Sequence, residues 1–344
     1  MLAWLFHEWE RRLHSATPNR VVRTFEWGLD WIPTRDFHPD AAEEAILDAY
    51  VANALADSDA FFSAPPTTAF SFNRTTGALG FPSALTTPHE ENNTVRARFF
   101  PTDPSSRWAR GHPRRAVVVL PHWNSDPDGH VGLCRMLARF GMNALRLSLP
   151  YHDERMPPEL TRADYIVSSN VARTLQACRQ AVLDARRCVD WLESEGMERI
   201  GILGTSLGSC LSMLTAAHEP RIRAAALNHV STYFADVVWE GLSTSHVREG
   251  MAGHIDLDML RRLWMPISPK AHIHRMGGIP TLLVYARYDL TFPVHLSREL
   301  IDAWREHGFP HEIAVLPCGH YSTGMTPFKW MDGYVLTKFL YRHL

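Results

Sequence analysis

The chain has 344 residues, of which 45% are hydrophobic and 21% are charged, so it can bury the core of a globular protein. Its net charge of −2, with basic residues scattered along the chain, excludes a general electrostatic attraction to nucleic acid or anionic lipid. The five cysteines are odd in number and form no CxxC motif, which favours a reducing, cytoplasmic setting over a disulfide framework.

Residues 1–75 are predicted to form an accessory segment with two helices. In the first, apolar residues at positions 2, 5, 6, 9 and 13 make a stripe suited to packing on the body, or on a partner as a homodimer through the N-terminal helices. Charged residues, Glu10 among them, interrupt the apolar run, so no signal peptide or membrane insertion is expected, and docking on a membrane surface is disfavoured. The second helix is expected to have Asp40 as its N-cap and Glu43 at capping-box spacing.

The remainder, 76–344, alternates apolar strand-like runs with helical segments of 10 to 25 residues. This pattern predicts an α/β domain with a doubly wound, mostly parallel sheet of about eight strands. Residues 232–275 interrupt the alternation and are predicted to form a helical insertion that caps the carboxyl edge of the sheet. The predicted strands include 93–101, 115–122, 143–150, 199–206, 222–231, 279–289 and 311–319.

A serine lies between two glycines where a buried strand is predicted to pass into a helix, in Gly204-Thr205-Ser206-Leu207-Gly208. One interpretation is a tight turn with no further role. The other is a nucleophile on a sharp strand-to-helix turn, where small neighbours avoid clashes with adjacent strands. The free N–H groups at the start of the helix would then face a developing oxyanion. The position between strand and helix favours the nucleophile.

A serine nucleophile needs a base, and the base needs a carboxylate that orients it. His320 follows the last predicted strand in a glycine-flanked loop, and Asp289 lies at the tip of the strand before it. An aspartate at such a tip is often only a turn or N-cap residue. Together, in the chain order Ser206, Asp289 and His320, these residues predict a catalytic triad.

The tetrahedral intermediate of acyl transfer requires two hydrogen-bond donors. The backbone N–H of Leu207 is the first, because this residue follows the nucleophile. The second is expected from Trp123 or Asn124 in the loop after strand 115–122, and the sequence does not separate the two; Trp123 also suits a wall of the acyl pocket. Further candidates for substrate binding are His122, Tyr151 and Trp239, although the segment around Tyr151 is equally typical of a structural turn.

With these residues assembled, about three quarters of the chain, from residue 78 to 344, resembles the α/β-hydrolase superfamily. The segments "VVVLPHWNSDPDGH", "LRLSLPYHDER" and "GILGTSLGS" are most similar to its dienelactone-hydrolase and prolyl-oligopeptidase-like branch. The resemblance implies Ser206 as nucleophile, Asp289 as acid and His320 as base. One departure is that the usual His-Gly after the third strand is His122-Trp123 here.

The sequence therefore predicts a carboxylesterase-like serine hydrolase that acts on a small acyl compound without a cofactor. Aromatic and apolar residues of the insertion indicate an apolar acyl or aromatic substrate: Trp239, Leu242, Trp264 and Met265. A thioesterase, a peptidase or a C–C bond hydrolase would use the same triad, and a non-catalytic binding module could share the fold.

No metal site is expected, because His272 and His274 have no carboxylate or cysteine partner at a convincing spacing. No G-x-G-x-x-G or P-loop motif is present, which argues against a nucleotide enzyme.

Overall fold

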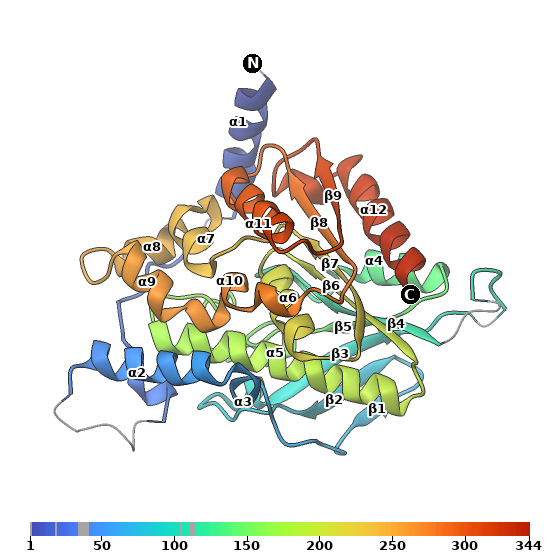
Figure 1. The fold of residues 1–344 in the computed structure, drawn as a ribbon, viewed down its shortest axis with the longest axis horizontal. Helices are drawn as coiled ribbons and strands as arrows, with labels where there is room; N and C mark the ends of the chain where they lie inside the picture. Colours follow the sequence, from blue (N-terminus) through green and yellow to red (C-terminus); the bar gives the residue numbers. More distant parts are fainter. Residues whose placement is uncertain (1, 18, 34–40, 104, 110–113) are drawn as a thin grey trace.

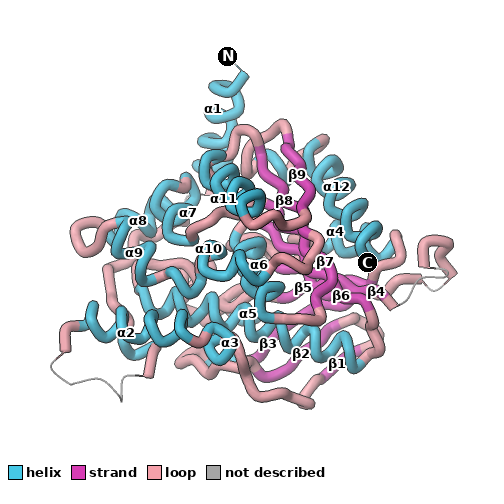
Figure 2. The backbone as a smooth tube through the Cα atoms, in the orientation of Figure 1, coloured by secondary structure: helices cyan, strands magenta, loops and turns pink. Residues whose placement is uncertain are grey.

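A sheet of nine strands runs through this computed structural model, which describes residues 2–17, 19–33, 41–103, 105–109 and 114–344 (Figures 1 and 2). The strands are β1 (Ser71–Asn73), β2 (Ala78–Pro82), β3 (Thr94–Phe100), β4 (Arg115–Leu120), β5 (Asn143–Leu147), β6 (Arg199–Thr205), β7 (Ile222–Asn228), β8 (Thr281–Ala286) and β9 (His311–Leu316). Their order is β1-β2-β3-β5-β4-β6-β7-β8-β9. The pairs β1–β2, β2–β3 and β3–β5 are antiparallel, and all the others are parallel. The predicted mostly parallel sheet is confirmed.

Helices cover both faces of the sheet (Figure 1). One face carries α4 (Val131–Arg139) and α12 (Phe328–His343), and the other carries α5 (Val171–Ser194), α6 (Leu207–His218) and α11 (Val294–Glu306). Strand β4 shows why both faces need cover. Val117 and Val119 belong to the apolar cluster of the first face, whereas Val118 and Leu120 belong to that of the second. Because alternate side chains of a strand point to opposite faces, an all-apolar strand requires helices on both.

The segment between β7 and β8 is helical, as predicted, and consists of α7 (Phe234–Glu240), α8 (Ser245–Met251), α9 (Leu257–Leu263) and α10 (Pro269–His272). Its packing is tied to α5, since the Trp264 indole is fully buried and its Nε1–H donates to the carbonyl oxygen of Val171 at 3.0 Å. A buried indole with its N–H paired anchors a segment firmly. The insertion is therefore part of the core on this side of the sheet.

Within the described residues, the α-helices α1 (Leu2–Ser15), α2 (Glu43–Ala56) and α3 (Ser58–Phe61) precede the sheet. Helix α2 begins after Ala42, and the expected N-cap Asp40 lies outside the described residues. Helix α1 extends outward from the body at its N-terminal end (Figure 1), where large apolar side chains are exposed: Leu2, Trp4 and Leu5. No helix in the described part of the chain is long and apolar enough to cross a membrane.

All five cysteines are free and buried. Burial raises the pKa of Cys134 and of Cys318 to about 12. They act as small apolar residues of the core, which agrees with the lack of a disulfide pattern in the sequence.

Candidate active site

Ser206 lies at the sharp turn between β6 and α6. Its backbone has φ 58° and ψ −123°, a conformation that is strained for a residue with a side chain. A Cβ atom on Gly204 would lie 2.0 Å from the Gly208 carbonyl oxygen, and one on Gly208 would lie 2.2 Å from the Leu120 carbonyl oxygen. Both glycines are therefore required for the chain to turn tightly beside β4, which is the geometry of a nucleophile elbow.

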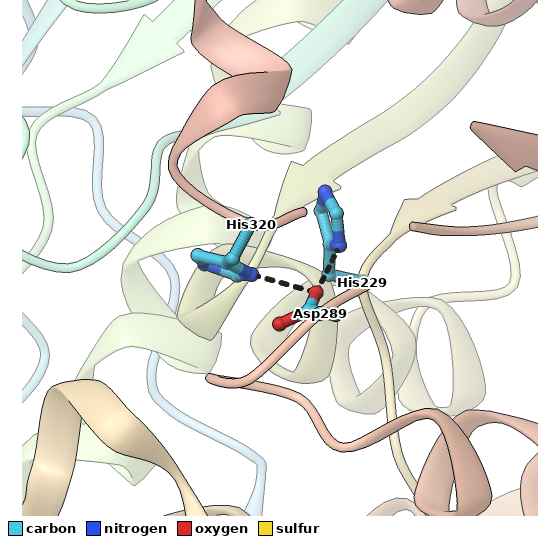
Figure 3. A group of neighbouring side chains, drawn as sticks. All are labelled: His229, Asp289 and His320. Carbon is cyan, nitrogen blue, oxygen red and sulfur yellow. Dashed lines mark hydrogen bonds and ion pairs between the residues drawn. The ribbon is translucent and has the colours of Figure 1, made fainter. Parts of the chain in front are cut away.

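The structure brings Ser206, His320 and Asp289 together from three strand ends. The Ser206 Oγ lies 3.1 Å from His320 Nε2. On the other side of the ring, His320 Nδ1 lies 2.9 Å from Asp289 Oδ2 (Figure 3). Because the carboxylate accepts a hydrogen bond from Nδ1–H, the Nε2 lone pair faces the serine hydroxyl. A hydroxyl, an imidazole and a carboxylate in this order can deprotonate the serine as it attacks a carbonyl carbon.

The Asp289 carboxylate is held in place on both of its oxygens. Oδ1 accepts hydrogen bonds from the backbone N–H groups of Thr291 and Phe292 at 2.8 and 2.7 Å. Burial raises the pKa of this carboxyl, but the imidazoles of His320 and His229 outweigh burial and leave the pKa well below its usual range. Asp289 is therefore ionised at neutral pH.

A second histidine, His229, contacts the same carboxylate and was not singled out in the sequence. Its Nδ1 lies 2.8 Å from Asp289 Oδ2, beside His320 (Figure 3), and its ring is almost completely buried. Burial and the neighbouring His320 lower the pKa of His229, so it is a neutral donor at pH 7. It follows Asn228 at the carboxyl end of β7, the sheet edge that carries the other site residues. That position is the signal by which the sequence could have revealed it.

The donor atoms of His229, Asp289 and His320 lie within 4.8 Å of one another, so these three residues could hold a metal ion. Both nitrogen–oxygen distances are those of direct hydrogen bonds. His320 Nε2 also faces Ser206 Oγ, and Asp289 Oδ1 accepts two backbone N–H groups. Hydrogen bonds alone thus account for the arrangement of this group around the carboxylate.

The pKa of His320 lies above its ordinary value of 6.5. Burial lowers the pKa of this imidazole, but the charge and hydrogen bond of Asp289 outweigh burial. The His320 imidazole is therefore a stronger base than a free histidine, and it becomes protonated when the pH falls below this raised pKa.

In the loop after β4, the two candidates for the second oxyanion donor differ in their backbone contacts. The Asn124 N–H donates to His152 Nε2 at 2.9 Å, so it is already paired. The N–H groups of Trp123 and Leu207 have no acceptor among the residues that the structure describes. The Trp123 indole donates its Nε1–H to the Ala163 carbonyl oxygen at 2.8 Å, and the residue lines the cavity over Ser206. A bulky residue thus fits at this position with its backbone N–H unpaired.

His152 fixes this loop from behind. Its Nδ1 lies 2.9 Å from the carbonyl oxygen of Pro150, so Nδ1 donates and Nε2 accepts from Asn124. Burial lowers the pKa of His152 to about 4, which keeps the imidazole neutral at physiological pH. A neutral ring with one donor and one acceptor is the form that this pair of contacts requires.

A cavity of about 740 Å³ opens over Ser206 and His320. Its walls come from both faces of the sheet, with α4 and α12 on one side and α7 on the other. Apolar side chains form much of the lining: Leu133, Met136, Phe234, Val237 and Val238. Charged side chains also line it: Arg20, Arg162, Lys329 and Asp332. The cavity can accept a small, mainly apolar molecule with its carbonyl group at the serine.

No family model matches the chain, and neither does any curated protein. Solved structures do match. An acetyl xylan esterase from Paenibacillus sp. R4 is 14% identical with a TM-score of 0.62, and the match covers 92% of this chain and 98% of the esterase. Acetyl xylan esterase 1 from Thermoanaerobacterium sp. JW/SL YS485 is 17% identical with a TM-score of 0.58, with 85% of this chain and 93% of that one covered.

An acylaminoacyl peptidase from Pyrococcus horikoshii is 14% identical with a TM-score of 0.59; the match covers 81% of this chain and 42% of the peptidase, so the chain spans about two fifths of that protein's length. These esterases and the peptidase are members of one superfamily. The chain has the α/β-hydrolase fold.

Two of the side chains expected to bind substrate in this α/β-hydrolase fold lie elsewhere. Tyr151 is buried outside the cavity lining, and its hydroxyl lies 3.4 Å from His89 Nδ1. Trp239 is also absent from the lining and packs against the core around the insertion. Only His122 of the three lines the cavity. From the insertion, residues of α7 line the cavity together with Ser243 and Thr244. Trp264 is not in the lining, because its side chain packs on α5.

Proposed function

We propose that this protein is a serine hydrolase that cleaves esters or related acyl compounds. The observation that carries the proposal is the unbroken hydrogen-bonded line from Ser206 through His320 to Asp289 at the floor of a cavity. The strained backbone at Ser206 supports it, because such strain is typical of functional residues.

In this mechanism Ser206 Oγ attacks the carbonyl carbon of the substrate while His320 Nε2 accepts the hydroxyl proton. The carbonyl oxygen becomes an oxyanion, which the N–H groups of Leu207 and Trp123 stabilise. The protonated imidazole gives its proton to the leaving group, and an acyl-enzyme remains. Water then attacks the ester carbon with His320 again as base, and Ser206 Oγ leaves with the proton.

The apolar part of the cavity favours an ester with a short acyl or aromatic group over a long polar peptide. A thioesterase, a peptidase or a C–C bond hydrolase would have the same triad and differ in the leaving group. Rates on matched oxygen esters, thioesters and anilides with one common acyl group would rank these activities, because only the leaving group changes.

A fluorophosphonate probe tests the proposal directly. We expect covalent labelling at Ser206, located by mass spectrometry of the labelled peptide, and none in Ser206→Ala or in the heat-unfolded chain. The activated serine attacks phosphorus, and the loss of fluoride leaves a stable phosphonylated enzyme. A folded protein that is neither labelled nor active on p-nitrophenyl acetate and butyrate would instead be a binding module.

The His152→Ala variant is expected to lower kcat by roughly 10- to 100-fold with little change in KM. Removal of the imidazole leaves the Asn124 N–H without its acceptor and releases the loop that carries the Trp123 N–H, and displaced catalytic groups have effects of this size. Steady-state kinetics on one ester measures the effect. The control is Tyr151→Phe, which removes a hydroxyl outside the cavity and should leave kcat unchanged. Equal rates in both variants would exclude this role for His152.

A further inference from the structure

The loop that carries His320 is fastened by a residue of the N-terminal helix. The Glu10 carboxylate of α1 accepts hydrogen bonds from the backbone N–H groups of Tyr321 and Ser322, at 2.8 and 2.9 Å. It also accepts one from the Ser322 hydroxyl at 2.7 Å. Glu10 is completely buried, although it lies more than 300 residues away in the sequence.

The contact extends to the residue before His320. The Ser322 hydroxyl that donates to Glu10 accepts a hydrogen bond from the Gly319 N–H at 2.8 Å. A Cβ atom on Gly319 would lie 2.3 Å from Glu10 Cδ, so the carboxylate lies directly against this part of the loop. Glu10 therefore contacts the backbone on both sides of His320.

Helix α1 also reaches the loop that carries Asp289. The Phe6 ring stacks on Tyr288, with 4.6 Å between the ring centroids and 10° between the planes. The Tyr288 N–H donates to the Cys318 carbonyl oxygen at 2.9 Å, which joins the two loops beneath the helix. One helix thus contacts the neighbours of both Asp289 and His320.

The contacts of Glu10 are more than the packing of an apolar helix on the body requires. A buried carboxylate is costly unless hydrogen bonds replace its water, and those of Glu10 come only from the His320 loop among the described residues. Its negative charge also helps to raise the pKa of His320. The other titratable groups that face His320 are Asp289, His229 and His122.

We propose that Glu10 is a positioning residue for His320, so that catalysis depends on the docked N-terminal helix. The proposal rests on the hydrolase function proposed above. Without Glu10, three donors of the loop lose their acceptor, and His320 Nε2 is no longer held 3.1 Å from Ser206 Oγ. If α1 were only a packing element, the loss of these three hydrogen bonds would change stability but neither kcat nor the pH profile.

The test compares Glu10→Ala and Glu10→Gln with Glu8→Gln, an exposed glutamate of the same helix that pairs with Arg12. For Glu10→Ala we expect kcat to fall on the order of 10²-fold with KM within threefold, as for a displaced catalytic group. Glutamine keeps one acceptor oxygen but no charge, so kcat should fall less. Its acid limb of kcat/KM should move to lower pH, because loss of the anion lowers the pKa of His320. Glu8→Gln should match the wild type.

Hydrogen exchange supplies a readout that does not depend on catalysis. The amides of Tyr321 and Ser322 should exchange faster in both Glu10 variants than in Glu8→Gln. The proposal is overturned if Glu10→Ala keeps kcat within twofold, if the acid limb of Glu10→Gln does not move, or if exchange is unchanged. A wild-type protein that fluorophosphonate does not label would overturn the hydrolase function instead, while exchange would still decide whether Glu10 orders the loop.

Discussion

The Ser206→Ala variant is expected to lose about 10⁶-fold in kcat/KM on any ester that the wild type cleaves, the effect of removing the nucleophile of a triad. A residual rate above that in water should remain, because the oxyanion donors and the cavity are intact. Stability should change little, because alanine also has a Cβ atom and therefore has the same backbone strain at φ 58° as serine. Only the hydrogen bond with His320 is lost.

Active-site titration with the fluorophosphonate probe and steady-state kinetics measure this loss. A matched control is Ser212→Ala in α6, the helix that follows Ser206, because the buried Ser212 hydroxyl has no hydrogen-bond partner within the described residues. It should retain wild-type activity. A Ser206→Ala protein that kept more than a few per cent of the rate would show that another group attacks the substrate.

The Asp289→Asn variant is expected to lower kcat by about 10⁴-fold through the wrong tautomer of His320. The two backbone N–H groups at Oδ1, from Thr291 and Phe292, will select the amide oxygen of asparagine for that position. The amide NH₂ must then occupy the Oδ2 position, facing Nδ1 of both His320 and His229. Each imidazole must then accept a hydrogen bond at Nδ1 and carry its proton on Nε2. His320 then has no lone pair toward Ser206.

The same substitution removes the charge that raises the pKa of His320. The acid limb of the remaining activity should therefore lie at a lower pH than in the wild type. Kinetics between pH 5 and 9 measure both effects, and circular dichroism confirms that the variant is folded. A loss below tenfold with an unmoved acid limb would mean that Asp289 does not set the state of His320.

Much of the fold could be predicted because its signals are local. The parallel strands are short apolar runs separated by amphipathic helices, and each run indicates a strand buried on both faces. Strands β1 and β2 were missed for a physical reason: β1 has three residues, and β2 contains Gly80 and Pro82. Neither offers an alternation long enough to recognise, and both depend on pairing with β3.

The residues of the candidate site also differ in whether local sequence signals could place them. Ser206, Asp289 and His320 follow strands that the sequence shows, so their meeting at one sheet edge could be expected. His229 follows β7 at the same edge, so its place could be expected too, whereas the contacts of Glu10 join parts of the chain more than 300 residues apart. Glu10 looked like one of several charged residues on the solvent face of a helix, whereas the structure buries it against the His320 loop.

Tyr151 and Trp239 lie outside the cavity lining, because a position near a sheet edge or in an insertion does not by itself direct a side chain toward the site. Tyr151 has φ 66°, and the turn directs its side chain into the body of the protein against His89. Such orientation depends on backbone geometry that residue order does not reveal.

The five buried thiols have a practical consequence for experiments on this chain. A raised pKa and full burial make a cysteine inert toward alkylating reagents while the surrounding core stays closed. Alkylation of the native protein should therefore proceed only as fast as segments open. The five positions lie in four parts of the chain: one in α4, two in α5, one in α6 and one after β9. The natural sequence thus carries its own set of reporters, and the order in which the thiols react would give the order in which these parts of the molecule unfold.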